Sequence, residues 1–177
     1  MAEVLLRHHL AEAGVDADVS SAGIYEGGAP ATGHGVAAMA ERGLDLEGHR
    51  SRRVDETMVQ AADLVIGMER EHVREAAVLD RGALAKTFTL KELVTLAEDA
   101  PPRSRDESLA SYLDRLAASR VPSTLLGVGH NEALDVEDPV GRGRRDYEVT
   151  ADLLDRLLRR VVDLTFPAGV PHQERTA

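Results

Sequence analysis

Residues 62–69 read ADLVIGME, and the centre of this stretch, LVIGM at 64–68, is a continuous apolar run of strand length. A strand with one face in water alternates apolar and polar side chains, whereas an unbroken apolar run is typical of a strand buried on both faces. Strands of that kind occur in parallel sheets that helices cover. The stretch therefore predicts a buried parallel strand.

Helical segments lie on both sides of this strand along the chain. Asp55 can cap a helix over ETMVQAA (56–62), and REHVREAAVL (70–79) is also helical in pattern. KTFTL (86–90) is the next expected strand, and a further helix begins near Lys91. This alternation predicts an α/β fold with a parallel sheet and helices on both of its faces.

The remaining elements are expected toward the two ends of the chain. DVSSAG (18–23) is predicted to be a short strand that runs into a glycine turn, and VAAMAERG (36–43) a helix that ends at Gly43. Ser104 and Glu107 have capping-box spacing before a helical apolar stripe. The strongest helical stripe comes last, with its apolar positions at Leu153, Leu154, Leu157, Leu158, Val161 and Val162.

The chain has the length of one domain and shows neither an internal repeat nor a second core pattern. We expect a single domain over 1–166, with an inserted loop and helix near 97–134. Residues 167–177 (PAGVPHQERTA) are expected to be a flexible tail.

Composition excludes several classes of function. Acidic residues outnumber basic ones by 31 to 21, for a net charge of −10, which disfavours nucleic acid as a partner. No apolar run approaches the length of a membrane span, and the first residues do not have the pattern of a secretory signal, so we expect a cytoplasmic protein without a membrane partner. The absence of cysteine excludes disulfides, thiolate metal sites and cysteine catalysis within these 177 residues.

Five positions are candidates for chemistry, and a structural interpretation competes with the functional one. Asp138 precedes a proline in a glycine-containing loop, where these residues alone favour an Asp-Pro turn. His49 in GHRSRR is more often a surface residue than a functional one. His8 and Glu12 share a helix face and could hold a metal, but two ligands are weak support. Tyr25 could line a pocket or merely cover the glycine-rich loop beside it.

The order of five segments is more specific than any one of them. The chain resembles the low-molecular-weight protein-tyrosine-phosphatase family from Met1 to about Phe166, outside the inserted region. The resemblance is carried by SSAG (20–23), GLDLEGHRSRRV (43–54), ADLVIGME (62–69), FTLKEL (88–93) and DPVGRGRRDYEV (138–149).

The resemblance implies a catalytic loop that these residues do not contain. In the family, the first strand ends in a phosphate loop with a Cys and an Arg separated by five residues, followed by Ser-Pro-x-Ala-Glu at the start of the first helix. MAE (1–3) resembles the end of that motif, so we expect that the chain starts just after the loop, through an internal start codon or a deletion. The central strand of the sheet, between those at 18–23 and 64–68, is then expected to be missing.

The resemblance also implies a mechanism and its residues. A Cys thiolate attacks phosphorus while loop amides and the Arg bind the phosphate oxygens, so neither a metal nor another cofactor is expected. Asp138 matches the general acid, Ser21 and His49 match residues that brace the phosphate loop, and Tyr25 matches an aromatic of the substrate cleft. The substrate is expected to be a phosphorylated protein or peptide. Val140 departs from the family, which commonly has an aromatic after Asp-Pro.

Several functions remain open at the level of sequence. The first is a phosphatase that acts through a phosphocysteine and is inactive as these 177 residues alone. The second is a non-catalytic relative that acts by binding or regulation. A third is a protein-arginine phosphatase, which the residues present do not separate from the first. Arsenate reduction would need further cysteines downstream and is disfavoured. No sequence feature fixes the oligomeric state.

Overall fold

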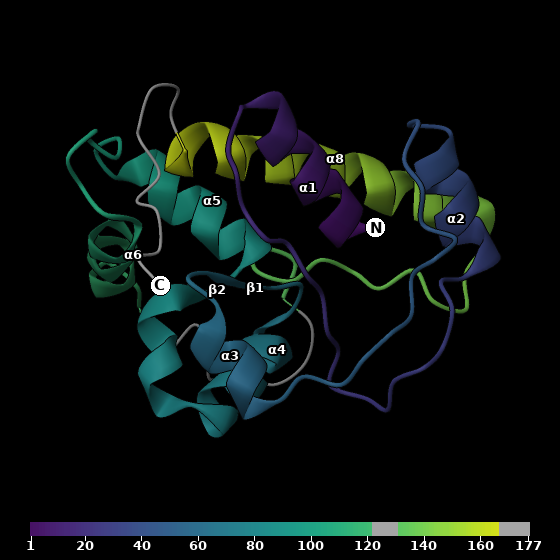
Figure 1. Cartoon of the computed structure of the whole chain (residues 1–177), viewed down its shortest axis with the longest axis horizontal. Coiled ribbons are helices and arrows are strands. Elements are labelled where there is room, and N and C mark those ends of the chain that lie inside the picture. Colours follow the sequence, from purple (N-terminus) through teal and green to yellow (C-terminus); the bar gives the residue numbers. More distant parts are fainter. Residues whose placement is uncertain (122–130, 167–177) are drawn as a thin grey trace.

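The computed structural model describes residues 1–121 and 131–166, and it has the predicted α/β architecture around a parallel sheet (Figure 1). Strand β1 (Val65–Gly67) pairs with β2 (Thr87–Thr89) in parallel, with Ile66 opposite Phe88. Strand β1 lies within the apolar run at 64–68, and β2 lies within the strand expected over 86–90. Parallel pairing is possible because α4 and a 3₁₀ helix form the crossover between the two strands.

The helices fall close to the periodic segments of the sequence. In chain order they are α1 (Ala2–Glu12), α2 (Gly33–Ala40), α3 (Glu56–Ala61), α4 (Arg70–Leu79), the 3₁₀ helix η1 (Arg81–Lys86), α5 (Leu90–Asp99), α6 (Leu109–Ala118) and α8 (Arg144–Thr165). Asp55 caps α3 as predicted, since its Oδ1 accepts a hydrogen bond from the Met58 amide at 2.8 Å.

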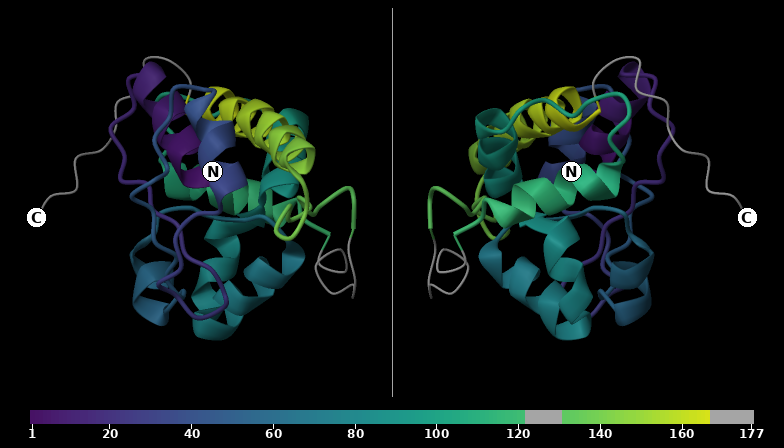
Figure 2. Two further views of the ribbon diagram at one scale, coloured as in Figure 1. Left: turned by 90° about the vertical axis from the view of Figure 1, so that its right-hand side faces the viewer. Right: turned by 90° about the vertical axis from the view of Figure 1, so that its left-hand side faces the viewer.

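Helices cover both faces of the sheet, as the apolar run at 64–68 predicts. In Figures 1 and 2, α1 and α8 lie on one side of the strands, and α3 and α4 lie on the other. The side chains of β1 follow the same division. Ile66 packs against the large core on the α8 side, whereas Val65 packs against a small cluster of Val59, Ala76 and Ala83 from α3, α4 and η1.

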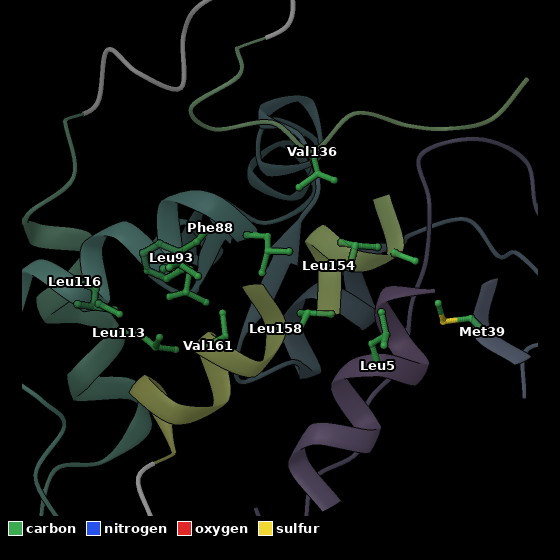
Figure 3. Close-up of a cluster of buried hydrophobic side chains, with 14 of the residues drawn as sticks. Leu5, Met39, Phe88, Leu93, Leu113, Leu116, Val136, Leu154, Leu158 and Val161 are labelled. Atoms are coloured by element: carbon green, nitrogen blue, oxygen red, sulfur yellow. The ribbon is translucent and has the colours of Figure 1, made fainter. Parts of the chain in front are cut away.

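The large core gathers around one face of α8 (Figure 3). Leu154, Leu158 and Val161 belong to the apolar stripe of this helix, and each is almost fully buried. Leu5 of α1 and Phe88 of β2 join the same cluster. An amphipathic helix acquires most of its stability from burial of such a face, so α8 fixes where the first helix and the strands sit.

Three details differ from the sequence predictions. Residues 18–23 do not form a strand: only Gly23 makes a bridge, to Arg53, so these amides have no continuous ladder partner within the described residues. The helix expected over 36–43 begins earlier and ends at Ala40, with Gly43 at a positive φ in the turn that follows. The cap of α6 is Ser108 rather than Ser104, because the Ser108 Oγ accepts from the Ser111 amide at 3.1 Å.

Parts of the predicted domain organisation lie outside the described residues, namely the tail over 167–177 and positions 122–130 of the inserted region. Among the helices of residues 1–121 and 131–166, none is both long enough and apolar enough to cross a membrane.

Candidate active site

The segment that carries Asp138 is attached to the carboxyl end of β1. Val136 donates a backbone hydrogen bond to the carbonyl of Met68, the residue after β1, at 2.8 Å. The Val136 side chain is buried in the large core, and Figure 3 shows it at the edge of this cluster, on the side of Leu154. Proteins of the α/β class bind ligands at the carboxyl edge of the parallel sheet. The contact of Val136 with Met68 therefore brings the loop that carries Asp138 to the edge where a ligand is expected.

A buried carboxylate, Asp135, anchors this segment. Its Oδ1 accepts a hydrogen bond from the Arg70 amide at 2.9 Å, its Oδ2 accepts one from the Asn131 amide at 2.8 Å, and the Arg70 guanidinium lies 3.4 Å away. Burial alone would raise the pKa of Asp135, but these backbone hydrogen bonds and the Arg70 charge together lower it. The carboxylate is therefore held ionised at the base of the loop.

Asp138 itself is exposed at the turn that leads to α8. Its Oδ1 accepts a hydrogen bond from the Val140 amide at 2.9 Å, which is the geometry of an Asx turn. Asp138 therefore forms the turn that the Asp-Pro pair predicts. The second carboxylate oxygen remains available to a proton or a substrate, because one accepted hydrogen bond uses only part of the capacity of a carboxylate.

Ser21 and His49 converge on Glu3 in the first turn of α1. The Ser21 Oγ donates to Glu3 Oε2 at 2.5 Å, and His49 Nδ1 lies 3.9 Å from the same oxygen. Arg7 completes the group with a hydrogen bond to Glu3 Oε1 at 2.5 Å. Burial tends to raise the pKa of Glu3, but the hydrogen bonds from Ser21 and Arg7, with the charges of Arg7 and His49, bring it below its ordinary value.

Tyr25 lies in a loop that is fixed to the segment after His49. The Gly28 amide donates to the Ser51 carbonyl at 2.7 Å, and the Ser51 amide donates to the Ala29 carbonyl at 2.9 Å. The Tyr25 side chain is 79% exposed, the most exposed large apolar side chain of the described residues. A ring held out in this way on an anchored loop is placed to contact a ligand rather than the core.

The predicted site residues thus fall into two groups. Ser21 and His49 meet at Glu3, and the Tyr25 loop is fixed to the strand-like segment that follows His49. Asp138 is positioned separately, through the attachment of its loop to β1. Glu3 and Asp135 were not predicted. The MAE match at 1–3 placed Glu3 in a motif without giving it a role, and no sequence signal pointed to Asp135.

Metal-ligating side chains gather at a different place. His8, His9 and Glu12 lie together near the C-terminal end of α1, away from the turn that carries Glu3. Glu3 is about seven residues before the centre of that group, which corresponds to about 10 Å along the helix axis.

Comparison with known proteins places these features in a family. The family model for low molecular weight phosphotyrosine protein phosphatase matches residues 1–116. A protein-arginine-phosphatase of Bacillus subtilis is 35% identical over 96 residues, 54% of this chain, and the match covers 63% of the length of that relative. A probable low molecular weight protein-tyrosine-phosphatase, EpsP of Ralstonia solanacearum, is 33% identical over 118 residues, which are 66% of this chain and 77% of that protein.

Solved structures share the fold. A cysteine-to-serine variant of the YwlE arginine phosphatase, with a phosphorylated active-site serine, superposes with a TM-score of 0.68 at 27% identity. The superposition covers 96% of this chain and 90% of that one. Because the family model matches residues 1–116 and the superposition covers 96% of the chain, the structural similarity extends beyond the segment that the family model matches.

Proposed function

The chain belongs to the low molecular weight phosphotyrosine protein phosphatase family, and on that premise we propose that it serves the hydrolysis of phosphorylated proteins or peptides. The observation that carries the proposal is the attachment of the Asp138 loop to the carboxyl end of β1 through Val136 and Asp135. A family match alone would also agree with a relative that has lost its catalytic activity. A proton donor held at the ligand-binding edge of the sheet is what a hydrolase requires.

In this proposal Asp138 is the general acid. It protonates the leaving oxygen or nitrogen of the substrate as the bond to phosphorus breaks, and then removes a proton from the water that attacks the phosphoenzyme. The exposed position of its carboxylate supports this role, since both the leaving group of a protein substrate and the attacking water have to reach it from solvent.

Ser21 and His49 are proposed to brace the phosphate loop through the start of α1. Their shared contact with Glu3 supports this, because Glu3 lies in the first helical turn, where a bound anion would meet the helix N-terminus. Tyr25 is proposed to line the substrate cleft. We also propose that the reaction needs no metal or other cofactor and takes place in the cytoplasm, without a nucleic-acid or membrane partner.

The nucleophile of this chemistry is a cysteine thiolate, and the 177 residues contain no cysteine. We therefore expect these residues alone to give no turnover of an aryl phosphate above buffer and no trapped phosphoenzyme. Translation of the DNA in frame upstream of Met1 tests the source of the nucleophile. The expected result is a Cys and an Arg separated by five residues and followed by Ser-Pro, and the protein that includes them should be active in the presence of a chelator.

Two outcomes would contradict the proposal. Vanadate-sensitive turnover by the 177 residues alone would show a different nucleophile. An upstream sequence without Cys and Arg would favour the non-catalytic alternative, a binding or regulatory relative. That alternative predicts saturable binding of a phosphopeptide without hydrolysis.

A protein-arginine phosphatase is the second candidate, and two observations favour it. The Bacillus subtilis relative carries that name, and Val140 stands where the family commonly has an aromatic that would stack on a phosphotyrosine ring. The Val140 side chain is 65% exposed, but it is smaller than an aromatic and offers no flat face on which a phosphotyrosine ring could stack. Parallel assays of the active protein with a phosphotyrosine and a phosphoarginine peptide separate the two, and the higher kcat/KM identifies the substrate class.

A further inference from the structure

The C-terminal half of α1 carries a cluster whose geometry is that of a metal site. His8, His9 and Glu12 each direct one ligand atom into a common space, and these atoms lie within 4.8 Å of one another. Within residues 1–121 and 131–166 no other three His, Cys, Asp or Glu side chains are arranged in this way. The helix itself explains the convergence, since Glu12 is four residues from His8 and three from His9.

Two contacts within the cluster are close to the ligand separations of a tetrahedral zinc ion, and because they involve different oxygens of Glu12, a small turn of that carboxylate would bring one oxygen to both histidines. Glu12 Oε1 lies 3.5 Å from His8 Nε2, and Glu12 Oε2 lies 3.4 Å from His9 Nδ1. With zinc-ligand bonds of about 2.1 Å, tetrahedral geometry separates two ligand atoms by about 3.4 Å. His8 is on the surface, so its ring can turn to close the remaining gap to His9.

A second carboxylate orients His9 from another helix. The His9 side chain is only 2% exposed, and its Nε2 lies 3.0 Å from Asp155 Oδ1 on α8. Asp155 can only accept, so Nε2 carries the proton of the neutral ring and Nδ1 presents its lone pair to Glu12. Ligating histidines commonly have such a carboxylate on their outer nitrogen, which fixes the tautomer and the ring.

This arrangement leaves two acceptors facing each other. The Nδ1 lone pair of a neutral His9 and the Glu12 carboxylate are 3.4 Å apart, and they repel unless a cation lies between them. That cation is either a proton on His9 or a metal ion bound by both groups. Arg159 Nη1 approaches Glu12 Oε2 to 3.5 Å, but its exposed side chain can move aside.

We propose that His8, His9 and Glu12 form a zinc-binding site, oriented by Asp155, with water as the fourth ligand. The site is separate from the proposed catalytic residues, and it would tie α1 to α8 through the His9–Asp155 hydrogen bond. The net charge of −10 favours the approach of a divalent cation.

Titration of the full 177-residue chain with Zn²⁺ tests the site, with protein that carries no polyhistidine tag. Calorimetry should give one equivalent of Zn²⁺, and Co²⁺ should give the intense visible absorption of a tetrahedral complex. His8→Gln and Glu12→Gln should each weaken Zn²⁺ binding at least 10-fold. Asp155→Asn should weaken it about 10–100-fold while the ligands remain in place. His34→Gln, on α2, is the matched control and should bind as the wild type does.

Arg159→Gln provides a test in the opposite direction. Removal of the cation that competes for Glu12 should strengthen Zn²⁺ binding, and a variant that had simply lost its fold could not give that result. Circular dichroism of each variant establishes that helix content is unchanged. Absence of Zn²⁺ binding by the wild type would overturn the proposal. Binding that His8→Gln and Glu12→Gln leave unaltered would overturn it as well.

Discussion

The carboxylate of Asp135 accepts a hydrogen bond from the backbone amide of Arg70, 65 residues earlier in the chain, at 2.9 Å. Both side chains are buried, and the Arg70 guanidinium pairs with the same carboxylate. The contact joins the start of α4, which follows β1, to the loop that carries Asp138. The geometry of the proposed acid thus depends on a residue that never needs to touch the substrate.

Asp135→Asn should destabilise the protein strongly. The substitution removes the negative charge that faces the buried Arg70 guanidinium, and breaking a buried ion pair typically costs about 3–5 kcal/mol. Urea denaturation at neutral pH measures the loss. Glu137→Gln, two residues away in the same loop, is the control: Glu137 is exposed, and we expect its variant to remain within about 0.5 kcal/mol of the wild type. Equal stability of Asp135→Asn and the wild type would contradict the anchoring role.

Acid should weaken a second carboxylate contact, between Glu107 and Arg115. The two hydrogen bonds from the Arg115 guanidinium, at 3.1 and 3.0 Å, lower the pKa of Glu107 below its value in an unfolded chain. A lowered folded pKa means that the contribution to stability is complete above the unfolded pKa, about 4.3, and is lost as the pH falls through the folded value.

The difference in unfolding free energy between wild type and Glu107→Gln should therefore be constant from pH 7 to about pH 5 and shrink toward zero below pH 4. Urea titrations of both proteins at several pH values provide the measurement. A difference that stays the same down to pH 3 would show that the charge of Glu107 does not matter to the fold.

The strands and most helices could be predicted because their signals are local. The apolar run at 64–68 predicts a strand buried on both faces, whichever residues cover it. The cap of α3 is local as well, because Asp55 accepts a hydrogen bond from the amide of Met58, three residues further along the chain. The prediction of a strand over residues 18–23 was wrong because strand formation depends on distant residues. A strand needs hydrogen bonds to a neighbouring strand, and the sequence pattern around Val19 and Ser21 carries no information about which strand lies beside it.

The candidate site was predictable only as far as the family order of motifs extends. Asp138, Ser21 and His49 occupy recognisable positions, but the contact of the last two with Glu3 joins three segments that are distant in sequence. Asp135 has no motif at all. Its partner lies 65 residues away, and a buried carboxylate looks the same in sequence as an exposed one. The same holds for His9, whose orienting partner Asp155 is on another helix.

The loop that carries Tyr25 depends on a close approach at Gly27. A Cβ added there would lie 2.7 Å from the Arg52 Cα and 2.8 Å from the Ser51 carbonyl oxygen, and neither backbone atom can move alone. Gly27→Ala should therefore push the loop off residues 50–53 and cost about 1–3 kcal/mol. Gly33→Ala, where a Cβ meets nothing within 4 Å, is the control and should cost nothing. Thermal melts compare the two, and an unchanged Gly27→Ala melt would refute the close contact.

The last prediction concerns Asp138 and applies to an active protein in which an upstream segment supplies the Cys and Arg of the proposed phosphate loop. Asp138→Asn keeps the side-chain shape and its hydrogen-bond acceptor for the Val140 amide but removes the transferable proton. Loss of a general acid typically costs about 10²–10⁴-fold, and only where the leaving group needs the proton. A nitrophenolate of low pKa hardly needs one, whereas an unsubstituted phenolate or the guanidine of phosphoarginine does.

The ratio of wild-type to Asp138→Asn kcat/KM should therefore rise steadily as the leaving group becomes more basic. A series of substituted phenyl phosphates, extended by a phosphoarginine peptide, provides the measurement. If Asp138 serves only the Asx turn, Asp138→Asn keeps the acceptor for the Val140 amide, so any loss of activity should be the same for every leaving group and should follow the loss of stability. A ratio that does not change with the leaving group would therefore leave Asp138 as a turn residue and remove it from the proposed chemistry.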